Sequence, residues 1–314
     1  MSRRRKGRPI DGWLVIDKPA AITSTDVVTR IKRSWQAQKV GHAGTLDPLA
    51  TGVLPVALGQ GTKTVAYVQD ATKEYRFTLC FGEARDTDDS EGKVIATSDV
   101  RPGDDEIRAA LGVFIGDIMQ VPPAFSAIKV AGERAYDLAR EGNPPELAPR
   151  PARVDRFALL ARPDADHAEF AVSSGKGVYM RSLARDLARA LGTVGHISAL
   201  RRLRVGPFTE AMAVPLDKAV PSEDNAPAQS PLLPVETALA DIPALALTEA
   251  EASPLKDGQA ISLVPLIGRI PPAADPDGGL VRAVAGGRAV ALGRLGDGML
   301  HPVRLLVPAK APSP

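Results

Sequence analysis

An α+β fold on a largely antiparallel or mixed sheet, followed by a small C-terminal β module, is predicted from three observations. Strand and helix patterns follow one another without a βαβ rhythm, which favours the α+β class. A proline-rich stretch, PSEDNAPAQSPLLP (221–234), is typical of a linker or a long surface loop. After about Leu255 helical periodicity gives way to short strand patterns with glycine between them, such as AISLV (260–264) and AVALGRL (289–295).

The first elements are a short buried strand and a capped helix. GWLVI (12–16) is a continuous apolar run that ends at an Asp-Lys-Pro turn, as expected for a short strand. TSTD (23–26) supplies an N-cap signal for the helix that follows. In that helix Val27, Ile31 and Trp35 recur every fourth residue and form one apolar face.

The middle of the chain predicts a half-buried strand and a polar turn. From Tyr75 onward, aromatic and aliphatic residues alternate with polar ones over residues 73–81, which is the period of a strand with one buried face. The acidic run DTDDSEG (86–92) does not fit a calcium loop, because its glycine is one place late and Thr97 stands where a glutamate is needed. We interpret it as a polar turn before a strand over 93–97.

Further elements follow from the same patterns. We expect helices over 104–114, 133–140 and from Tyr179 to Gly192, and strands over 154–160 and 167–173. The segment 120–129 (QVPPAFSAIK) cannot be helical because of its two prolines, and 143–151 is a proline-rich loop. In the helix after Tyr179, leucines lie on one side and Arg181, Arg185 and Arg189 on the other.

Composition limits the functional class. No run of eighteen apolar residues exists, so no membrane span is expected, and no apolar stretch follows the basic N-terminus as in a secretory signal. The single cysteine, Cys80, excludes an internal disulfide and a CxxC motif, and we expect it to be a small buried side chain. These features predict a cytoplasmic protein.

Positive charge is clustered although the net charge is only +2. Basic residues dominate the arm 1–9 and the block 176–204, which indicates one face for a polyanion. A solvated tail is the simpler interpretation of the arm taken alone. The cations of the block are Lys176, Arg181, Arg185, Arg189, Arg201, Arg202 and Arg204.

The stretch KVGHAGTLDPLATGVLPVALGQGTK (39–63) holds five glycines, yet it matches neither common phosphate-binding template. The histidines show no zinc-binding spacing, and no GxSxG motif is present. What remains is Asp47, which Pro48 keeps out of the helical region. An Asp-Pro pair is also ordinary turn chemistry, so both interpretations stay open at this point.

The motifs resemble those of the bacterial tRNA pseudouridine-55 synthases, the TruB family. The resemblance covers about residues 10–210, in order, and the tail from PALALTEAEASPLKDGQAI onward is similar to the family's small PUA-type RNA-binding module. The motifs that carry it are DGWLVIDKPAAITS, GHAGTLDPLATGVLPVALGQGTK, KEYRFTLCFGEARDTDDSEG, QVPPAFSAIKVAGERAYDLAREG and GKGVYMRSLARDLARALGTVGHISALRRLRVGPF.

The resemblance implies isomerisation of uridine 55 in the T-loop of tRNA to pseudouridine. The N1–C1′ bond breaks, the uracil turns over, and C5 bonds to C1′, so the resemblance implies no cofactor and no metal. A carboxylate is needed beside the ribose, either as nucleophile or as base, and the family's motif assigns this role to Asp47. Both roles remain open. The target nucleotide must be flipped out of the folded loop to be reached.

The resemblance also assigns the remaining site residues. They are Asp47, Tyr75 and Arg181 as catalytic residues, and His42, Tyr75, Tyr179, Leu200, Lys18 and Lys176 as substrate-binding residues. Arg181 would pair with the aspartate, and His42 would stack where the base has left. Tyr75 and Leu200 also fit an ordinary core, and the two lysines would make structural or phosphate contacts.

The predicted domains are a basic arm (1–9), a catalytic domain (10–240) with an RNA-gripping insertion at about 121–150, and a PUA-like module (241–314). The expected partner is the T-arm and elbow of tRNA, with no membrane and no required protein partner, and we expect a monomer. Ala21 stands where the family usually has glycine, which questions a positive-φ turn there. Two alternatives are an RNA-folding chaperone, which needs no placed carboxylate, and the related guide-RNA-dependent synthase.

Overall fold

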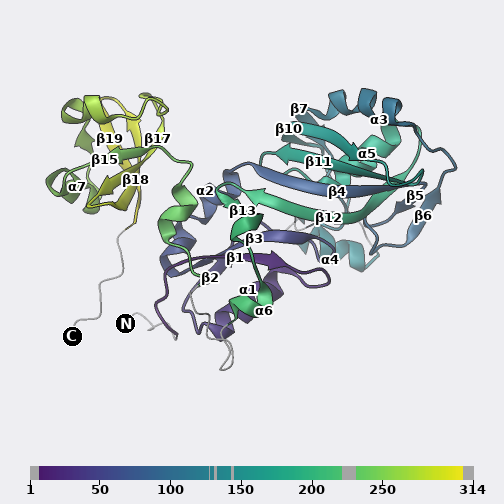
Figure 1. The fold of residues 1–314 in the computed structure, drawn as a ribbon, viewed down its shortest axis with the longest axis horizontal. Helices are drawn as coiled ribbons and strands as arrows, with labels where there is room; N and C mark the ends of the chain where they lie inside the picture. The colour runs from purple at the N-terminus through teal and green to yellow at the C-terminus, as the bar shows by residue number, and fades with distance from the viewer. Residues whose placement is uncertain (1–6, 127, 131–132, 143–144, 221–230, 307–314) are drawn as a thin grey trace.

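A ten-stranded mixed sheet and a separate five-stranded sheet organise the chain (Figure 1). The computed structural model describes residues 7–126, 128–130, 133–142, 145–220 and 231–306. Most of the predicted linker and of the basic arm therefore lies outside the described residues. None of the described helices has both the length and the apolar composition needed to cross a bilayer.

The large sheet is mainly antiparallel, as predicted. Among its described pairings only β1 with β14 and β3 with β12 are parallel. Its strands in spatial order are β14 (Val214–Pro215), β1 (Gly12–Lys18), β3 (Thr51–Leu58), β12 (Gly195–Val205), β4 (Lys73–Phe81), β11 (His167–Ser174), β10 (Arg150–Ala161) and β7 (Gly116–Gln120), with β2 (Val40–His42) on β3 and β13 (Phe208–Thr209) on β12.

Strand β1 is buried on both faces, which explains its continuous apolar run. Leu14 and Ile16 belong to the main core, whereas Trp13 and Val15 belong to a second core on the other face. The main core is closed by α1 (Ser24–Ser34), α3 (Asp104–Leu111) and α5 (Met180–Ala190), and the second by α2 (Val65–Asp70) and η4 (Val235–Leu239). The apolar face predicted for α1 is confirmed, since Val27 and Ile31 are fully buried.

Local sequence signals set several boundaries. Helix α1 begins with a reciprocal capping box, in which the Asp26 amide donates to Thr23 Oγ1 at 3.0 Å and the Thr23 amide donates to the Asp26 carboxylate at 3.0 Å. The predicted strand over 73–81 is β4 with the same boundaries. Helix α5 ends before Gly192, whose positive φ of 71° suits glycine.

The remaining elements of the N-terminal part are short. They are η1 (Gly59–Lys63), β5 (Glu83–Arg85), β6 (Val94–Thr97), η2 (Gly112–Phe114), β8 (Lys129–Val130), β9 (Glu133–Arg134), α4 (Ala135–Arg140), η3 (Glu210–Met212) and α6 (Leu216–Ala219). The strand expected over 93–97 is β6, which pairs with β5 across the acidic turn. The helix expected over 133–140 is α4, preceded by strand β9.

The C-terminal part has its own sheet and its own core, as predicted for a β module. Its elements are β15 (Ala244–Ala246), α7 (Glu249–Lys256), β16 (Ile261–Ser262), η5 (Val264–Arg269), β17 (Leu280–Ala285), β18 (Arg288–Gly296) and β19 (Met299–Leu305). The strand expected over 260–264 is only two residues long. Proline 265 lies at the start of η5 and cannot donate to a strand ladder, so the chain turns there.

The turn after β1 keeps a left-handed residue although glycine is absent. Ala21 has a φ of 65°, and its amide donates to the carbonyl of Pro48 at 2.9 Å. An alanine in this region costs roughly 1–2 kcal/mol relative to a relaxed conformation. The turn is therefore held by its surroundings, and it contacts the loop that carries Asp47.

We expect Ala21→Gly to raise the free energy of unfolding by up to about 1 kcal/mol, because glycine relieves the left-handed strain and loses only part of that gain to chain entropy. Chemical denaturation of both proteins measures the difference. A lower free energy of unfolding for the glycine variant would show that the turn is unstrained.

Candidate active site

Asp47 lies in the loop between β2 and β3, and the chain holds this loop on both sides of it. The buried Ser24 hydroxyl accepts from the Leu46 amide at 2.9 Å and donates to the Leu46 carbonyl at 3.0 Å. On the other side the Lys18 ammonium donates to the carbonyls of Pro48 at 3.2 Å and Ala50 at 2.7 Å. The catalytic candidate thus stands on a clamped backbone, as a preorganised site requires.

Lys18 is a buried structural cation. Its side chain is fully buried at the end of β1, and its third hydrogen bond goes to the Pro19 carbonyl at 2.8 Å. Burial lowers the pKa of Lys18 to about 8, and the charge of Asp47 opposes this shift. The ammonium is therefore protonated at neutral pH, and of the two predicted roles the structural one fits Lys18.

The carboxylate of Asp47 faces Arg181, which lies in the first turn of α5. Arg181 Nε lies 3.0 Å from Asp47 Oδ2, and the side chain of Asp47 is 37% exposed whereas that of Arg181 is 5% exposed. The Nε–H does not aim at the oxygen, so the contact is an ion pair rather than a hydrogen bond. The carboxylate is therefore charge-stabilised and still open to a substrate.

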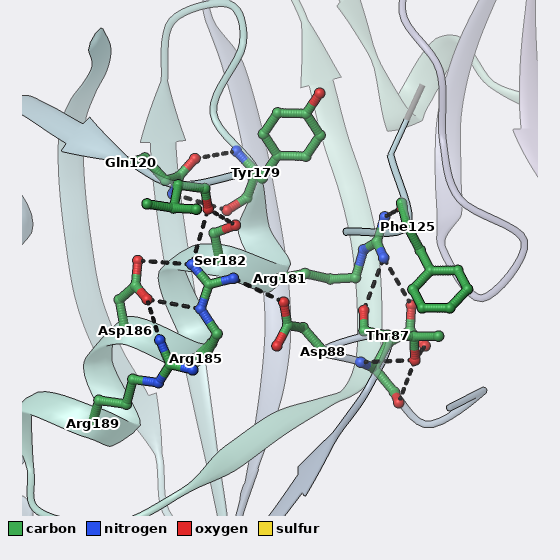
Figure 2. A network of polar contacts seen from close by, with 12 residues as sticks. Thr87, Asp88, Gln120, Phe125, Tyr179, Arg181, Ser182, Arg185, Asp186 and Arg189 are labelled. Atoms are coloured by element: carbon green, nitrogen blue, oxygen red, sulfur yellow. Dashed lines mark hydrogen bonds and ion pairs between the residues drawn. The ribbon is translucent and has the colours of Figure 1, made fainter. Parts of the chain in front are cut away.

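Arg181 has partners on its other nitrogens as well. Nη1 donates to the Thr87 carbonyl at 2.9 Å and lies 3.6 Å from Asp89 Oδ2, and Nη2 donates to the Phe125 carbonyl at 2.9 Å (Figure 2). Asp89 is 2% exposed. A guanidinium with this many fixed partners has one orientation, which lysine could not reproduce.

A second arginine, Arg202, supports the loop from behind. It is fully buried on β12, and its guanidinium donates to the carbonyls of Val53 at 2.8 Å, Gly44 at 3.0 Å and Thr45 at 3.4 Å. The Tyr75 hydroxyl also interacts with it. Arg202 therefore links the Asp47 loop to the tyrosine of β4.

Tyr75 and Tyr179 approach the same region from different elements. Tyr75 is half-buried on β4 and packs against the main core, opposite Arg202 in the neighbouring strand. Tyr179 is the N-cap residue of α5, and burial together with the charge of Asp47 raises the pKa of its hydroxyl. The Tyr179 hydroxyl is thus neutral at neutral pH, and it lies within the electrostatic reach of Asp47. Leu200 is 8% exposed within the main core.

His42 is half-buried at the end of β2, on the strand that enters the loop. Burial and then the charge of Arg202 lower the pKa of its imidazole. A neutral ring is the form that stacks on a base without a desolvation penalty for charge.

Lys176 stands apart from this group. Its ammonium binds Asp70 at 2.8 Å, and its side chain is 70% exposed. This predicted site residue is therefore an exposed cation that pairs with the last residue of α2.

The predicted phosphate-binding face of the block 176–204 is wrong for several of its arginines. Arg181 and Arg202 are buried, the Arg185 side chain is 13% exposed, and Arg201 is paired with Asp17 at 2.9 Å and Glu210 at 2.6 Å. Carboxylates and carbonyls of the protein itself therefore partner these four arginines. Of the three arginines of α5, Arg189 is the exposed one, at 67% of its side chain.

Sequence reasoning missed three supporting residues: Ser24, Asp89 and Arg202. Asp89 was part of a run interpreted as a plain polar turn. The sequence feature that could have indicated its role is the pair of adjacent aspartates, 88 and 89, which match two arginines one helical turn apart on α5. The signal for Arg202 was weaker, because a tandem arginine on a strand looks like surface charge. Burial of one of the two became visible only in three dimensions.

Comparison with known proteins agrees with this geometry. A family model described as "TruB family pseudouridylate synthase (N terminal domain)" matches residues 32–180, and a "tRNA pseudouridylate synthase B C-terminal domain" model matches 181–240. A protein named tRNA pseudouridine synthase B from Gluconacetobacter diazotrophicus is 70% identical over 97% of this chain and 100% of its own length. One of the same name from Rhodospirillum rubrum is 55% identical over 98% and 99%.

Solved structures share the fold. A chain in the crystal structure of a Cbf5-Nop10-Gar1 complex matches with a TM-score of 0.72 at 27% identity, over 95% of this chain and 85% of that one. A chain in an H/ACA RNP bound to a substrate RNA containing 2′-deoxyuridine matches with a TM-score of 0.73 at 24% identity, over 99% and 92%. The mixed sheet, together with the matched family models, defines a pseudouridine synthase. Within that class, the chain belongs to the TruB family.

The buried lysine provides a test of the site's support. Because the pKa of Lys18 is lowered to about 8, the unfolded chain binds more protons at this residue than the folded chain between about pH 8 and 10. The free energy of unfolding, relative to a Lys18→Met variant, should therefore rise with pH in that window, by at most about 1.4 kcal/mol per pH unit. Denaturant titrations at pH 7.5, 8.5 and 9.5 measure it. A difference that stays constant or falls with pH would contradict a buried ammonium with a lowered pKa.

Proposed function

We propose that the protein is a tRNA pseudouridine synthase that isomerises uridine 55 of the T-loop. One observation carries the proposal: in a chain of the TruB family, a solvent-accessible carboxylate, Asp47, stands on a clamped loop and faces the buried guanidinium of Arg181. The names of the relatives, tRNA pseudouridine synthase B, support tRNA as the substrate.

The reaction needs a carboxylate that meets the ribose of a flipped-out uridine. Asp47 either attacks a carbon as nucleophile or removes a sugar proton as base, and its open oxygens serve both routes. The N1–C1′ bond breaks and the uracil rotates in the pocket. C5 then bonds to C1′, the C5 proton is lost and N1 takes up a proton; in the nucleophile route the Asp47–sugar bond breaks as C5 bonds to C1′, and in the base route Asp47 returns the sugar proton. Arg181 keeps the Asp47 carboxylate charged until it reacts, and its positive charge stays beside the site when the detaching uracil takes the electron pair of the N1–C1′ bond.

The surrounding side chains serve the flipped nucleotide. Tyr75 packs against the uracil and offers its hydroxyl for the C5 proton, while Tyr179 and Leu200 line the pocket. The neutral ring of His42 stacks where the base has left the loop. Lys18 acts through the backbone, because its ammonium is bound to three carbonyls.

The proposed partner is the T-arm and elbow of tRNA. The protein works in the cytoplasm as a monomer, without a required protein partner, and the part after residue 241 acts as a PUA-like RNA-binding module. The buried arginines do not contribute to phosphate binding, because internal partners hold their charges. The reaction uses no cofactor, because no atom is oxidised and no bond is hydrolysed.

Tritium release from tRNA labelled at uracil C5 tests the proposal directly. Wild-type protein should release about one tritium per unmodified transcript. A transcript in which cytidine replaces uridine 55, with all other uridines labelled, should release none. Asp47→Asn should lower the rate at least about 100-fold while tRNA binding persists, because the amide can neither attack nor take a proton. Asp105→Asn, at a fully exposed carboxylate on α3, is the matched control and should keep the wild-type rate.

Two outcomes would overturn the proposal. Binding without tritium release by wild-type protein would indicate an RNA chaperone, and release by Asp47→Asn at the wild-type rate would remove the carboxylate from the mechanism.

A further inference from the structure

The segment 120–125, hereafter the insertion root, leaves β7 and begins the predicted RNA-gripping insertion. Its sequence is QVPPAF, and neither proline has an N–H. The root therefore cannot donate to a strand ladder at the two prolines. Two of its carbonyls, those of Val121 and Phe125, accept from donors outside any strand. Those donors are side chains of α5.

Three α5 side chains hold two carbonyls of the insertion root. The Val121 carbonyl accepts from Ser182 Oγ at 2.8 Å and from Arg185 Nη2 at 2.9 Å, and the Phe125 carbonyl accepts from Arg181 Nη2 at 2.9 Å (Figure 2). At the start of the root, the Gln120 side-chain amide pairs with the backbone of Tyr179 at 2.8 and 3.1 Å. The root is thus docked along the first turns of α5.

Arg185 is also tied to the acidic turn. Its Nη1 lies 3.0 Å from Asp88 Oδ2 and its Nε 2.8 Å from Asp186 Oδ1, and its side chain is 13% exposed. Asp88 adopts a left-handed conformation, with a φ of 60°, which turns its carboxylate toward α5. Adjacent aspartates, 88 and 89, thus face arginines that are one helical turn apart, 185 and 181.

We propose that Arg185 is a positioning residue, which sets the insertion root against α5 and thereby keeps the Arg181 guanidinium in register with Asp47. This inference rests on the proposed function. The link is physical, because the Phe125 carbonyl and the Asp47 carboxylate bind the same guanidinium from different nitrogens. A root that shifts takes the Phe125 carbonyl with it, and Arg181 then loses one of the partners that fix its plane, the partner of Nη2.

The forked shape of arginine is essential to this role. One guanidinium reaches Asp88, Asp186 and the Val121 carbonyl together. A lysine at the same place keeps the charge opposite the aspartates, but its single nitrogen cannot hold the carboxylates and the carbonyl in one geometry. Arg185→Lys therefore separates the positioning of the root from plain ion pairing across the turn.

The test compares Arg185→Gln and Arg185→Lys with Arg189→Gln, which removes the exposed arginine one turn further along α5. Hydrogen exchange of the free protein is measured in peptides that cover the insertion root. We expect faster exchange there in both Arg185 variants and wild-type exchange in Arg189→Gln. Single-turnover tritium release at saturating protein should fall about tenfold in both Arg185 variants, with the dissociation constant for tRNA changed less than about threefold.

Each result decides the proposal. If Arg185→Lys shows wild-type exchange and a wild-type rate, Arg185 acts only through ion pairing. If the variants lose only tRNA affinity, Arg185 contacts RNA instead. Either result overturns the proposal. If Arg185→Gln unfolds, Arg185→Lys carries the test. The exchange measurement needs no activity, so absence of tritium release from the wild-type protein overturns the proposed function, while unchanged exchange in the variants overturns the positioning role.

Discussion

The ion pair between Arg181 and Asp47 is the interaction on which the rest of the structure depends. The arginine is buried, and a buried charge that loses every carboxylate partner is left uncompensated, which is strongly destabilising. Further partners of Arg181 prevent such an uncompensated charge. A second carboxylate, Asp89, and two carbonyls hold the guanidinium, so its orientation does not depend on the half-exposed Asp47. In the proposed function, Asp47 can therefore meet a substrate without releasing the arginine.

Buried cations likewise hold the backbone of the Asp47 loop by several hydrogen bonds each. Lys18 and Arg202 lie under the Asp47 loop. Lys18 binds two backbone carbonyls of the glycine-rich stretch 39–63, and Arg202 binds three. The glycines matter where the backbone comes close. At Gly52, with a φ of 96°, a Cβ would lie 2.2 Å from the Arg202 carbonyl oxygen, so no other residue allows β3 and β12 to pair there. The permissive loop is thus rigid because cations behind it fix its carbonyls.

Much of the fold follows from local patterns in the sequence. The alternation in β4, the capping box of α1 and the glycine after α5 lead to the observed elements, because each depends on neighbours along the chain. The order of strands in the sheet does not follow from them, since it depends on long-range pairing. Charge was the weakest guide: Arg185 and Arg202 look like surface cations in the sequence, and only their distant partners Asp88 and Val53 show that they are internal. Asp47 and Arg181 were indicated by motif resemblance, and composition alone pointed no further than a turn.

A double-mutant cycle of Asp89→Asn and Arg181→Lys, read by single-turnover tritium release and by denaturation, tests most directly whether the acidic turn fixes the arginine for Asp47. If Asp89 does fix Arg181, adding the second substitution should lower the rate little further. Either substitution alone already lets the side chain at position 181 rotate away from Asp47. The double variant should then be at least about tenfold faster than the product of the two single effects predicts. Independent, multiplicative losses would show that Asp89 and Arg181 act separately, and would contradict the account.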